Sequence, residues 1–373
     1  MDTRGTVAPA GAVRARPRLS WWLSGLATAI WAVAVLAFGH LARVVDHWES
    51  SVTMLFGSFL AGSSPEGGGA VAFPIFTKGL EVPSPVARTF GLSIQAVGMT
   101  MASISILLSG RPFHRRAVLV AGPAAIGGFA VAVAAFGRPE ELFWSSSIGA
   151  AWVKASFSIL LATTSILMLR HLRSAPDRDL LALAWNRRLD VGVVCVAAAG
   201  GFLSSLTGTG ANIVLFLFLV VLVGVAPKEA LPSAIMVMAA VSVVGLVLFG
   251  LVDGQLDVDV VGDRVVAVGG RAADLDAGRA DLLGLWLAAV PVVVWGAPLG
   301  SLAASLVAEH QLVRFVAVLA AVEVATTFLL VPELRTEVSL VLYLVIGLAA
   351  LPLAFVVAQR RRLSLFGTEV GRA

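Results

Sequence analysis

Eight uninterrupted apolar runs, each about 20 residues long, constrain the fold of this chain more than any other feature. They occupy residues 21–39, 89–110, 116–137, 147–169, 230–252, 282–305, 312–331 and 338–358. Backbone polar groups in lipid need partners within their own segment, so such runs predict transmembrane α-helices. Charged residues make up 13% of the chain, about half the share usual in soluble domains. The predicted fold class is an all-α polytopic membrane protein, with a retained first span rather than a cleaved signal.

The remaining composition excludes several classes of protein. The net charge is +4, but the arginines gather at the ends of apolar runs, which indicates membrane topology and no nucleic-acid partner. The single cysteine, Cys195, excludes an internal disulfide and a cysteine-based metal centre. No motif of a metalloprotease, a serine hydrolase or a P-loop is present. The sequence therefore predicts no enzyme, no metal, no cofactor and no ATP-driven transport by this chain alone.

Two further apolar regions are interrupted, 51–80 at "SSPEGGG" and 191–225 at "TGTGAN". Arginine-rich stretches at 111–116, 170–188 and 359–362 should be cytoplasmic, and the acidic stretch 253–281 should lie outside. All of these stretches fall on the expected sides only if both interrupted regions are re-entrant hairpins. The sequence thus predicts eight spans and two hairpins, with both termini cytoplasmic. Only three lysines beside abundant arginine indicate a GC-rich bacterial source, and so a bacterial cytoplasmic membrane.

The two interrupted regions resemble each other in sequence. Residues 57–87 align without a gap on 200–230, and the identities include Gly57, Phe59, Leu60, Gly67, Val82 and Ala87. The hairpins open from opposite sides and each precedes three spans, which is typical of inverted-repeat secondary transporters. The predicted division is 1–50 (N-terminus and first span), 51–170 (first repeat), 171–189 (cytoplasmic loop), 190–331 (second repeat, with outer loop 253–281) and 332–373 (last span and tail).

At these residues the chain resembles a known family. "GSFLAGSSPEGGGAVAFPIF" and "GGFLSSLTGTGANIVLFLFLVVLVGVAPKEAL" are similar to the paired glycine-rich motifs of the TauE/SafE family of sulfite-exporter-like anion permeases. The segment 291–331 resembles the closing part of that family, so the resemblance covers about 50–331. It implies a transporter of sulfite, sulfonate, thiosulfate or a related small anion. Pro65, Glu66, Ala211 and Asn212 depart from the glycine pattern and leave the substrate open.

The two hairpin tips are the candidate substrate site. A return arm that begins a helix at its tip presents unpaired N–H groups, which attract anions, and glycine allows close approach of a ligand. Serine, threonine and asparagine side chains would add neutral donors. The alternative is that the glycines only permit tight helix packing. The candidate substrate-binding residues are Ser63, Ser64, Gly67, Gly68, Gly69, Thr207, Gly208, Thr209, Gly210 and Asn212.

Four other polar residues lie in apolar surroundings. Glu66 and Glu323 are candidates for proton coupling, with a helix cap and a buried structural partner as the respective alternatives. Lys154 and Gln95 are pathway candidates; Lys154 could instead snorkel to the interface or pair with Glu323, and Gln95 could bond a neighbouring helix.

Two cations, Arg88 and Lys228, follow the hairpins and are interpreted as interface or entrance charges. The predicted function is proton-coupled secondary transport of a small anion by alternating access in the lipid bilayer, with a homo-oligomer left open. An anion channel is the main alternative; a membrane enzyme, a scaffold and a sensor are less favoured.

Overall fold

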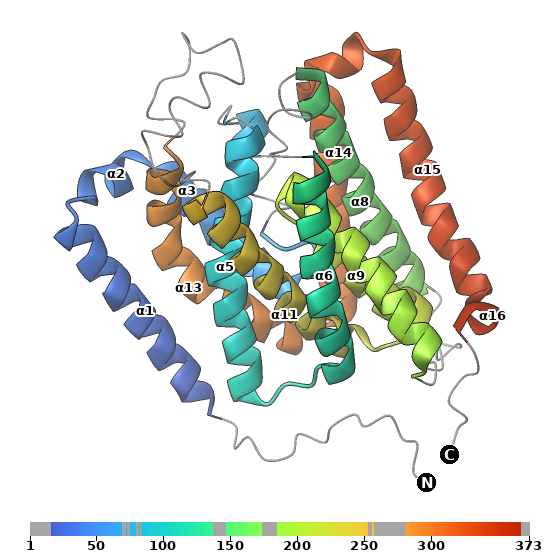
Figure 1. The fold of residues 1–373 in the computed structure, drawn as a ribbon, viewed down its shortest axis with the longest axis horizontal. Coiled ribbons are helices and arrows are strands. Elements are labelled where there is room, and N and C mark those ends of the chain that lie inside the picture. The colour runs from blue at the N-terminus through green and yellow to red at the C-terminus, as the bar shows by residue number, and fades with distance from the viewer. Residues whose placement is uncertain are drawn as a thin grey trace.

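The computed structural model describes residues 16–68, 72, 75–79, 82, 84–136, 147–173, 185–252, 256 and 281–366. Throughout this part of the chain the regular secondary structure is helical and contains no strand. The helices pack side by side as one bundle (Figure 1). The predicted all-α fold class is therefore confirmed.

Nine helices in the described residues are long and apolar enough to cross a membrane. Eight of them match the predicted apolar runs. The ninth, α9, forms the first half of the second interrupted region. The nine are α1 (Pro17–Ala37), α5 (Ser84–Ser109), α6 (Arg115–Phe136), α8 (Ser147–Arg173), α9 (Arg187–Thr207), α11 (Pro227–Gly245, continued by the π-helix η3, Leu246–Val252), α13 (Leu282–Leu306), α14 (Glu309–Leu330) and α15 (Val338–Arg360).

Shorter elements connect these helices and complete the two interrupted regions. They are α2 (Leu41–Asp46), α3 (Trp48–Ser63), the π-helix η1 (Ile75–Gly79), α10 (Ala211–Leu217), the π-helix η2 (Phe218–Val223), the 3₁₀-helix η5 (Pro332–Arg335) and α16 (Arg362–Phe366). Each interrupted region therefore has a first arm, α3 or α9, and a return arm that ends in a π-helical turn.

The return arms of the two regions end in the same local geometry. The amide of Val82 donates to the carbonyl of Phe76 at 2.8 Å, and the amide of Val225 donates to that of Leu219 at 2.9 Å. These two hydrogen bonds are 143 positions apart, which is the offset of the sequence repeat. η1 and η2 begin at the same offset, at Ile75 and Phe218.

The two regions also fold back at matching residues. A Cβ added to Gly68 would lie 3.0 Å from the carbonyl oxygen of Gly57, and a Cβ added to Gly200 would lie 2.8 Å from Cα of Ala211. The pairs 57/68 and 200/211 share the repeat offset. In both regions a glycine therefore lets the return arm lie close against the first arm.

Each first arm packs against a helix of the other half of the chain. α3 packs on α13, and α9 packs on α6. A Cβ on Gly62 of α3 would overlap the carbonyl oxygen of Ala297, and a Cβ on Gly201 of α9 would overlap that of Ala125. Small residues allow this close backbone approach, as is common between membrane helices.

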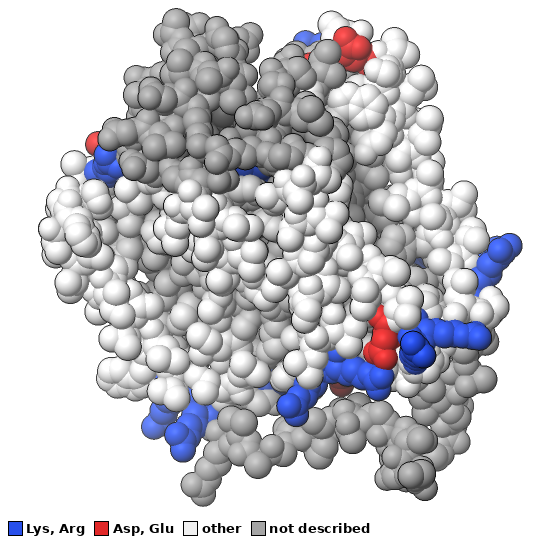
Figure 2. Space-filling model, viewed as in Figure 1, with Lys and Arg blue, Asp and Glu red and all other residues white. Residues whose placement is uncertain are grey.

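Most of the exposed arginines lie at one end of the bundle, which we call the basic end (Figure 2). Four contacts between elements far apart in sequence show which helix ends lie at the basic end. They are the amide of Arg16 to the carbonyl of Leu108 (2.7 Å), the Arg111 guanidinium to the carbonyl of Ser301, the amide of His114 to Ser233 Oγ (2.8 Å), and Asn186 Nδ2 to the carbonyl of Phe366 (2.6 Å).

The second interrupted region begins and ends at this basic end. α9 starts there beside Asn186, and the ring of Phe218 in η2 packs edge-on against Phe366 at 5.5 Å. α11 then starts at the same end, since its Ser233 accepts the bond from His114. The first interrupted region begins away from the basic end, since Ser50 of α3 donates to the carbonyl of Leu285, near the start of α13.

Candidate functional site

The second tip (207–212) is a tight reversal between α9 and α10. Gly208 has φ +78° and Gly210 has φ +142°, conformations that favour glycine. The amide of Gly208 donates to the carbonyl of Ser204 at 2.9 Å, which closes the last turn of α9. The glycines at these two positions are therefore required by the backbone path itself.

Two amides of the second tip are already used within it. The amide of Ala211 donates to Ser204 Oγ at 2.9 Å, and the amide of Gly210 donates to Asn212 Oδ1 at 3.3 Å. The sequence leads one to expect unpaired N–H groups here for an anion. The reversal brings Ser204 to the amide of Ala211, and Asn212 Oδ1 meets the amide of Gly210 within the tip. The side-chain Nδ2 of Asn212 is then a donor that makes no hydrogen bond with the described residues.

The threonine hydroxyls hold the second tip together. Thr207 Oγ1 donates to the carbonyl of Leu203 at 3.1 Å and also contacts the carbonyl of Thr209. Thr209 Oγ1 donates to Asn212 Oδ1 at 3.3 Å. Thr209 therefore holds Oδ1 of Asn212, while Nδ2 of the same side chain lies beside Gly67 of the first tip.

The first tip (63–68) follows the end of α3 and is buried throughout. The amide of Ser64 and its hydroxyl both donate to the carbonyl of Leu60, at 2.9 and 3.1 Å. Gly67 has φ +71°, and Glu66 is completely buried. Gly69, the remaining candidate of this tip, lies outside the described residues.

The two tips meet in the structure. A Cβ added to Gly67 would lie 2.9 Å from Asn212 Nδ2 of the second tip and 3.6 Å from Gln95 Oε1. Gln95 Nε2 donates to the carbonyl of Gly208 at 2.9 Å. Gln95 of α5 therefore touches both tips at once, and this contact links the two halves of the sequence repeat.

Residues on one face of α5 lie against both tips. Arg88, Gly91, Gln95 and Met99 recur at helical spacing. Gly208 packs on the backbone of Arg88 and lies near Gly91, whereas Gly67 lies against Gln95 and Met99. The tips therefore lie side by side along this helix, with the second tip nearer its start.

Several buried polar atoms around the tips make no hydrogen bond with the described residues. They are Ser63 Oγ, both carboxyl oxygens of Glu66, Gln95 Oε1 and Asn212 Nδ2. Most buried polar groups in proteins have a partner, so each exception needs an explanation. A cluster of such atoms where two glycine-rich tips meet is what a polar ligand would satisfy.

Arg88 does not lie at the interface that the sequence interpretation assigned to it. Its side chain is 0% exposed and its guanidinium stacks 4.1 Å from the ring centroid of Phe249. Gly208 of the second tip lies against the backbone of Arg88, and Phe249 of η3 packs on its guanidinium, which the sequence could not show. Lys228, by contrast, is exposed at the start of α11.

Glu323 and Lys154 lie in a separate polar cluster between α8 and α14. Glu323 is 3% exposed and accepts from Ser158 Oγ at 3.2 Å and from Thr327 Oγ1 at 3.3 Å. Ser158 also donates to the backbone carbonyl of Lys154 at 3.1 Å. The structure thus places these two candidates near each other rather than beside the tips.

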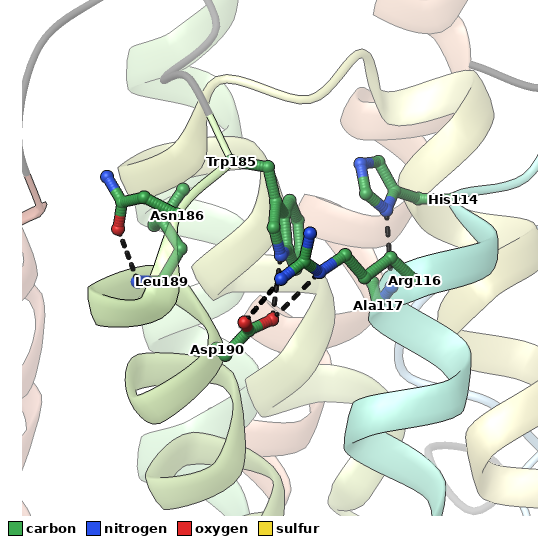
Figure 3. A network of polar contacts seen from close by, with 7 residues as sticks. All are labelled: His114, Arg116, Ala117, Trp185, Asn186, Leu189 and Asp190. Atoms are coloured by element: carbon green, nitrogen blue, oxygen red, sulfur yellow. Dashed lines mark hydrogen bonds and ion pairs between the residues drawn. The ribbon is translucent and has the colours of Figure 1, made fainter. Parts of the chain in front are cut away.

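A polar network at the basic end joins the starts of α6 and α9 (Figure 3). Arg116 forms two hydrogen bonds with the carboxylate of Asp190, at 3.1 and 2.6 Å, and Trp185 Nε1 donates to the same carboxylate at 2.8 Å. His114 stacks on Trp185 at 4.3 Å, and its Nδ1 accepts from the amide of Ala117 at 3.2 Å. Burial and the charge of Arg116 lower the pKa of His114 below 6.5, although a backbone hydrogen bond opposes this.

The fold and the buried contact between two glycine-rich tips define a multi-pass membrane protein of the transporter class. Residues 50–324 match the family described as "Sulfite exporter TauE/SafE". The chain belongs to this family, whose members transport anions across membranes and are not enzymes. Comparison with curated proteins gave no match, and comparison with solved structures gave none either.

Proposed function

We propose that this protein is a secondary active transporter of a small anion such as sulfite, a sulfonate, thiosulfate or a related organosulfur acid. The contact between Gly67 of the first tip and Asn212 of the second carries this proposal. It joins the two repeat halves at a buried place where polar atoms lack partners among the described residues. Alternating access would expose this place to each side of the membrane in turn.

The donors around the tips suit the oxygens of a small oxyanion. Asn212 Nδ2 and Ser63 Oγ can donate without carrying charge. The start of α10 also directs its helix dipole toward the tip, which favours a negative ligand. Neutral donors would bind an anion without holding it too tightly for release.

Glu66 is the proposed proton-coupling group. An ionised carboxylate is costly in a completely buried position. A protonated carboxyl group beside the site can donate to the anion, whereas an ionised one repels it. Glu323 remains a second candidate for the proton path.

The proposed membrane orientation places the basic end in the cytoplasm of a bacterial cell, since arginine is favoured on that side. Both termini would then be cytoplasmic. The two interrupted regions would be re-entrant hairpins. In support, α9 and α11 both begin at the basic end, whereas α3 begins away from it and α5 ends at it. Their tips would meet inside the bilayer, where irregular backbone is tolerated only when protein or a polar cavity surrounds it.

Transport by proteoliposomes tests the function. Purified protein should exchange labelled sulfite, methanesulfonate or thiosulfate against the same anion on the other side, and an inward proton gradient should drive uptake. Asn212→Ala should reduce exchange, whereas Gly122→Ala, which meets no atom within 4 Å, should not. If none of these anions exchanges, the proposed function is wrong. A current without counter-exchange would indicate a channel instead.

A further inference from the structure

We propose that Gln95 determines substrate specificity, and that the site prefers a small oxyanion that carries a hydrogen-bond donor of its own, such as bisulfite. This inference rests on the proposed function and adds a requirement on the substrate to it. It follows from which of the buried polar atoms around the tips can donate a hydrogen bond and which can only accept one.

The orientation of the Asn212 side chain is set by its contacts within the second tip. Its Oδ1 accepts from the amide of Gly210 and from Thr209 Oγ1, both at 3.3 Å. A backbone amide can only donate, so the oxygen of Asn212 must face Gly210 and the nitrogen must face the other way. Asn212 Nδ2 therefore offers a donor, and no acceptor, to the place where the tips meet.

The orientation of the Gln95 side chain is set in the same way, with the opposite result. Its Nε2 donates to the carbonyl of Gly208 at 2.9 Å. A carbonyl can only accept, so the nitrogen of Gln95 must face Gly208 and the oxygen must lie elsewhere. A Cβ added to Gly67 would lie 3.6 Å from this Oε1. Gln95 therefore offers an acceptor, and no donor, on the side of the first tip.

This donor and this acceptor lie beside the same glycine and are both unpaired. Asn212 Nδ2 and Gln95 Oε1 are each within 4 Å of the Cβ position of Gly67. Asn212 is 1% exposed and Gln95 is 2% exposed. Neither atom makes a hydrogen bond with the described residues. A buried polar atom without a partner is costly, so a ligand that satisfies both atoms is favoured.

The other unpaired atoms of the tips leave this requirement in place. Ser63 Oγ can donate or accept, and Glu66 offers further acceptor oxygens in either protonation state. Neither carboxyl oxygen of Glu66 bonds Gln95 in the structure. A ligand that has only acceptors can pair with Asn212, but it would bring a second oxygen against Gln95 Oε1 and leave that atom unpaired.

A singly protonated oxyanion meets the requirement. Bisulfite in its hydroxyl form has oxygens that accept from Asn212 and an O–H that can donate to Gln95. Methanesulfinate has the same charge and nearly the same size, but a methyl group replaces the hydroxyl. A site built to pair with a ligand hydroxyl discriminates strongly against the analogue that lacks it. The two anions therefore form a matched pair of probes.

Binding to the unmodified protein tests the requirement directly. Protection against thermal unfolding is measured in detergent at pH 6 over a range of concentrations of bisulfite, methanesulfinate and thiosulfate. Bisulfite should give the same protection as methanesulfinate at a concentration at least about tenfold lower. Equal protection by the two anions, or better protection by methanesulfinate, would overturn the proposal. Absence of protection by all three anions would instead reject the proposed function, on which this inference rests.

Variants then assign the preference to Gln95. Methionine has a similar length but no amide, so Gln95→Met should lower the preference for bisulfite from about tenfold or more to about twofold or less. A merely structural role of Gln95 would weaken the binding of both anions alike and would leave their ratio unchanged. The matched control is Gln311→Met, which replaces an exposed glutamine and should change neither affinity.

Asn212→Ala provides the converse result. It removes a donor that any oxyanion can use, so both anions should bind more weakly while bisulfite stays preferred. If Gln95→Met keeps the full preference for bisulfite, another group recognises the hydroxyl and the role proposed for Gln95 is wrong. If Gln95→Met does not fold, the comparison of the two anions on the unmodified protein still decides whether the site requires a donor.

Discussion

Gly67 of the first tip lies so close to Asn212 of the second that a methyl group on Gly67 would come within 2.9 Å of the side-chain amide nitrogen. The two residues are 145 positions apart in the chain. Their contact closes the space between the repeat halves and leaves the Asn212 amide pointing at the first tip. Both the stability of the tips and the binding of a substrate should therefore depend on this pair.

Replacing Gly67 by alanine should destabilise the protein and impair transport. The added Cβ would press on Asn212 and on the methyl group of Met99, and φ +71° is unfavourable for alanine. We expect a loss of about 1–3 kcal/mol in the free energy of unfolding. Thermal unfolding in detergent checks this, with Gly122→Ala as the control at a position that meets no atom within 4 Å. Equal stability of both variants would show that the tips are not in contact.

Replacing Asn212 by aspartate should abolish anion binding while preserving the tip. The remaining oxygen can still accept from Gly210 and Thr209, as Asn212 Oδ1 does. The donor that faces the first tip becomes an acceptor, and an ionised carboxylate would repel the substrate. We expect protection by methanesulfonate to weaken by at least about tenfold. Unchanged protection, with the unfolding temperature unchanged as well, would place the substrate elsewhere.

Neighbouring glycines in α6 offer a matched test of helix packing. A Cβ on Gly128 would overlap the backbone carbonyl of Ala198 in α9, whereas a Cβ on Gly127 would meet nothing within 4 Å. Gly128→Ala should therefore cost about 3 kcal/mol or more, because neither backbone can yield easily. Gly127→Ala should be neutral or slightly stabilising, since alanine favours a helix. Size-exclusion profiles and thermal unfolding of the two variants should differ clearly; similar behaviour would contradict the close packing of α6 on α9.

The helices could be predicted from the sequence because their signal is local. A run such as 282–305 is long and free of charge, and the structure has α13 at Leu282–Leu306. The glycine-rich interruptions were equally visible, because a proline, a carboxylate and consecutive glycines do not continue a membrane helix. Family membership followed from these same residues.

The position of Arg88 could not be predicted in this way. In the sequence it begins an apolar run, where arginine normally marks the interface. Its side chain packs on Phe249, 161 positions further along the chain, which is a tertiary relationship. The cap on the amide of Ala211 could not be predicted for the same reason, since Ser204 meets α10 only after the chain reverses.

Stability should decrease as the pH falls below about 6.5, because His114 at the basic end resists protonation. The folded pKa of His114 lies below its unfolded value of 6.5, mainly because the ring is partly buried. The neutral ring therefore contributes stability above pH 6.5, and this contribution is lost as the pH falls through that value and then through the lower folded pKa. Protonation of Nδ1 would also remove the acceptor that caps α6 through the amide of Ala117.

His114→Asn should flatten this part of the pH profile. Asparagine is a favourable helix N-cap and can accept from the same amide, but it does not titrate. Unfolding temperatures of the two proteins should be similar at pH 8 and should diverge between pH 6.5 and 5, with the variant losing less. A variant that loses stability as steeply as the unmodified protein would show that other groups cause the acid sensitivity of the basic end.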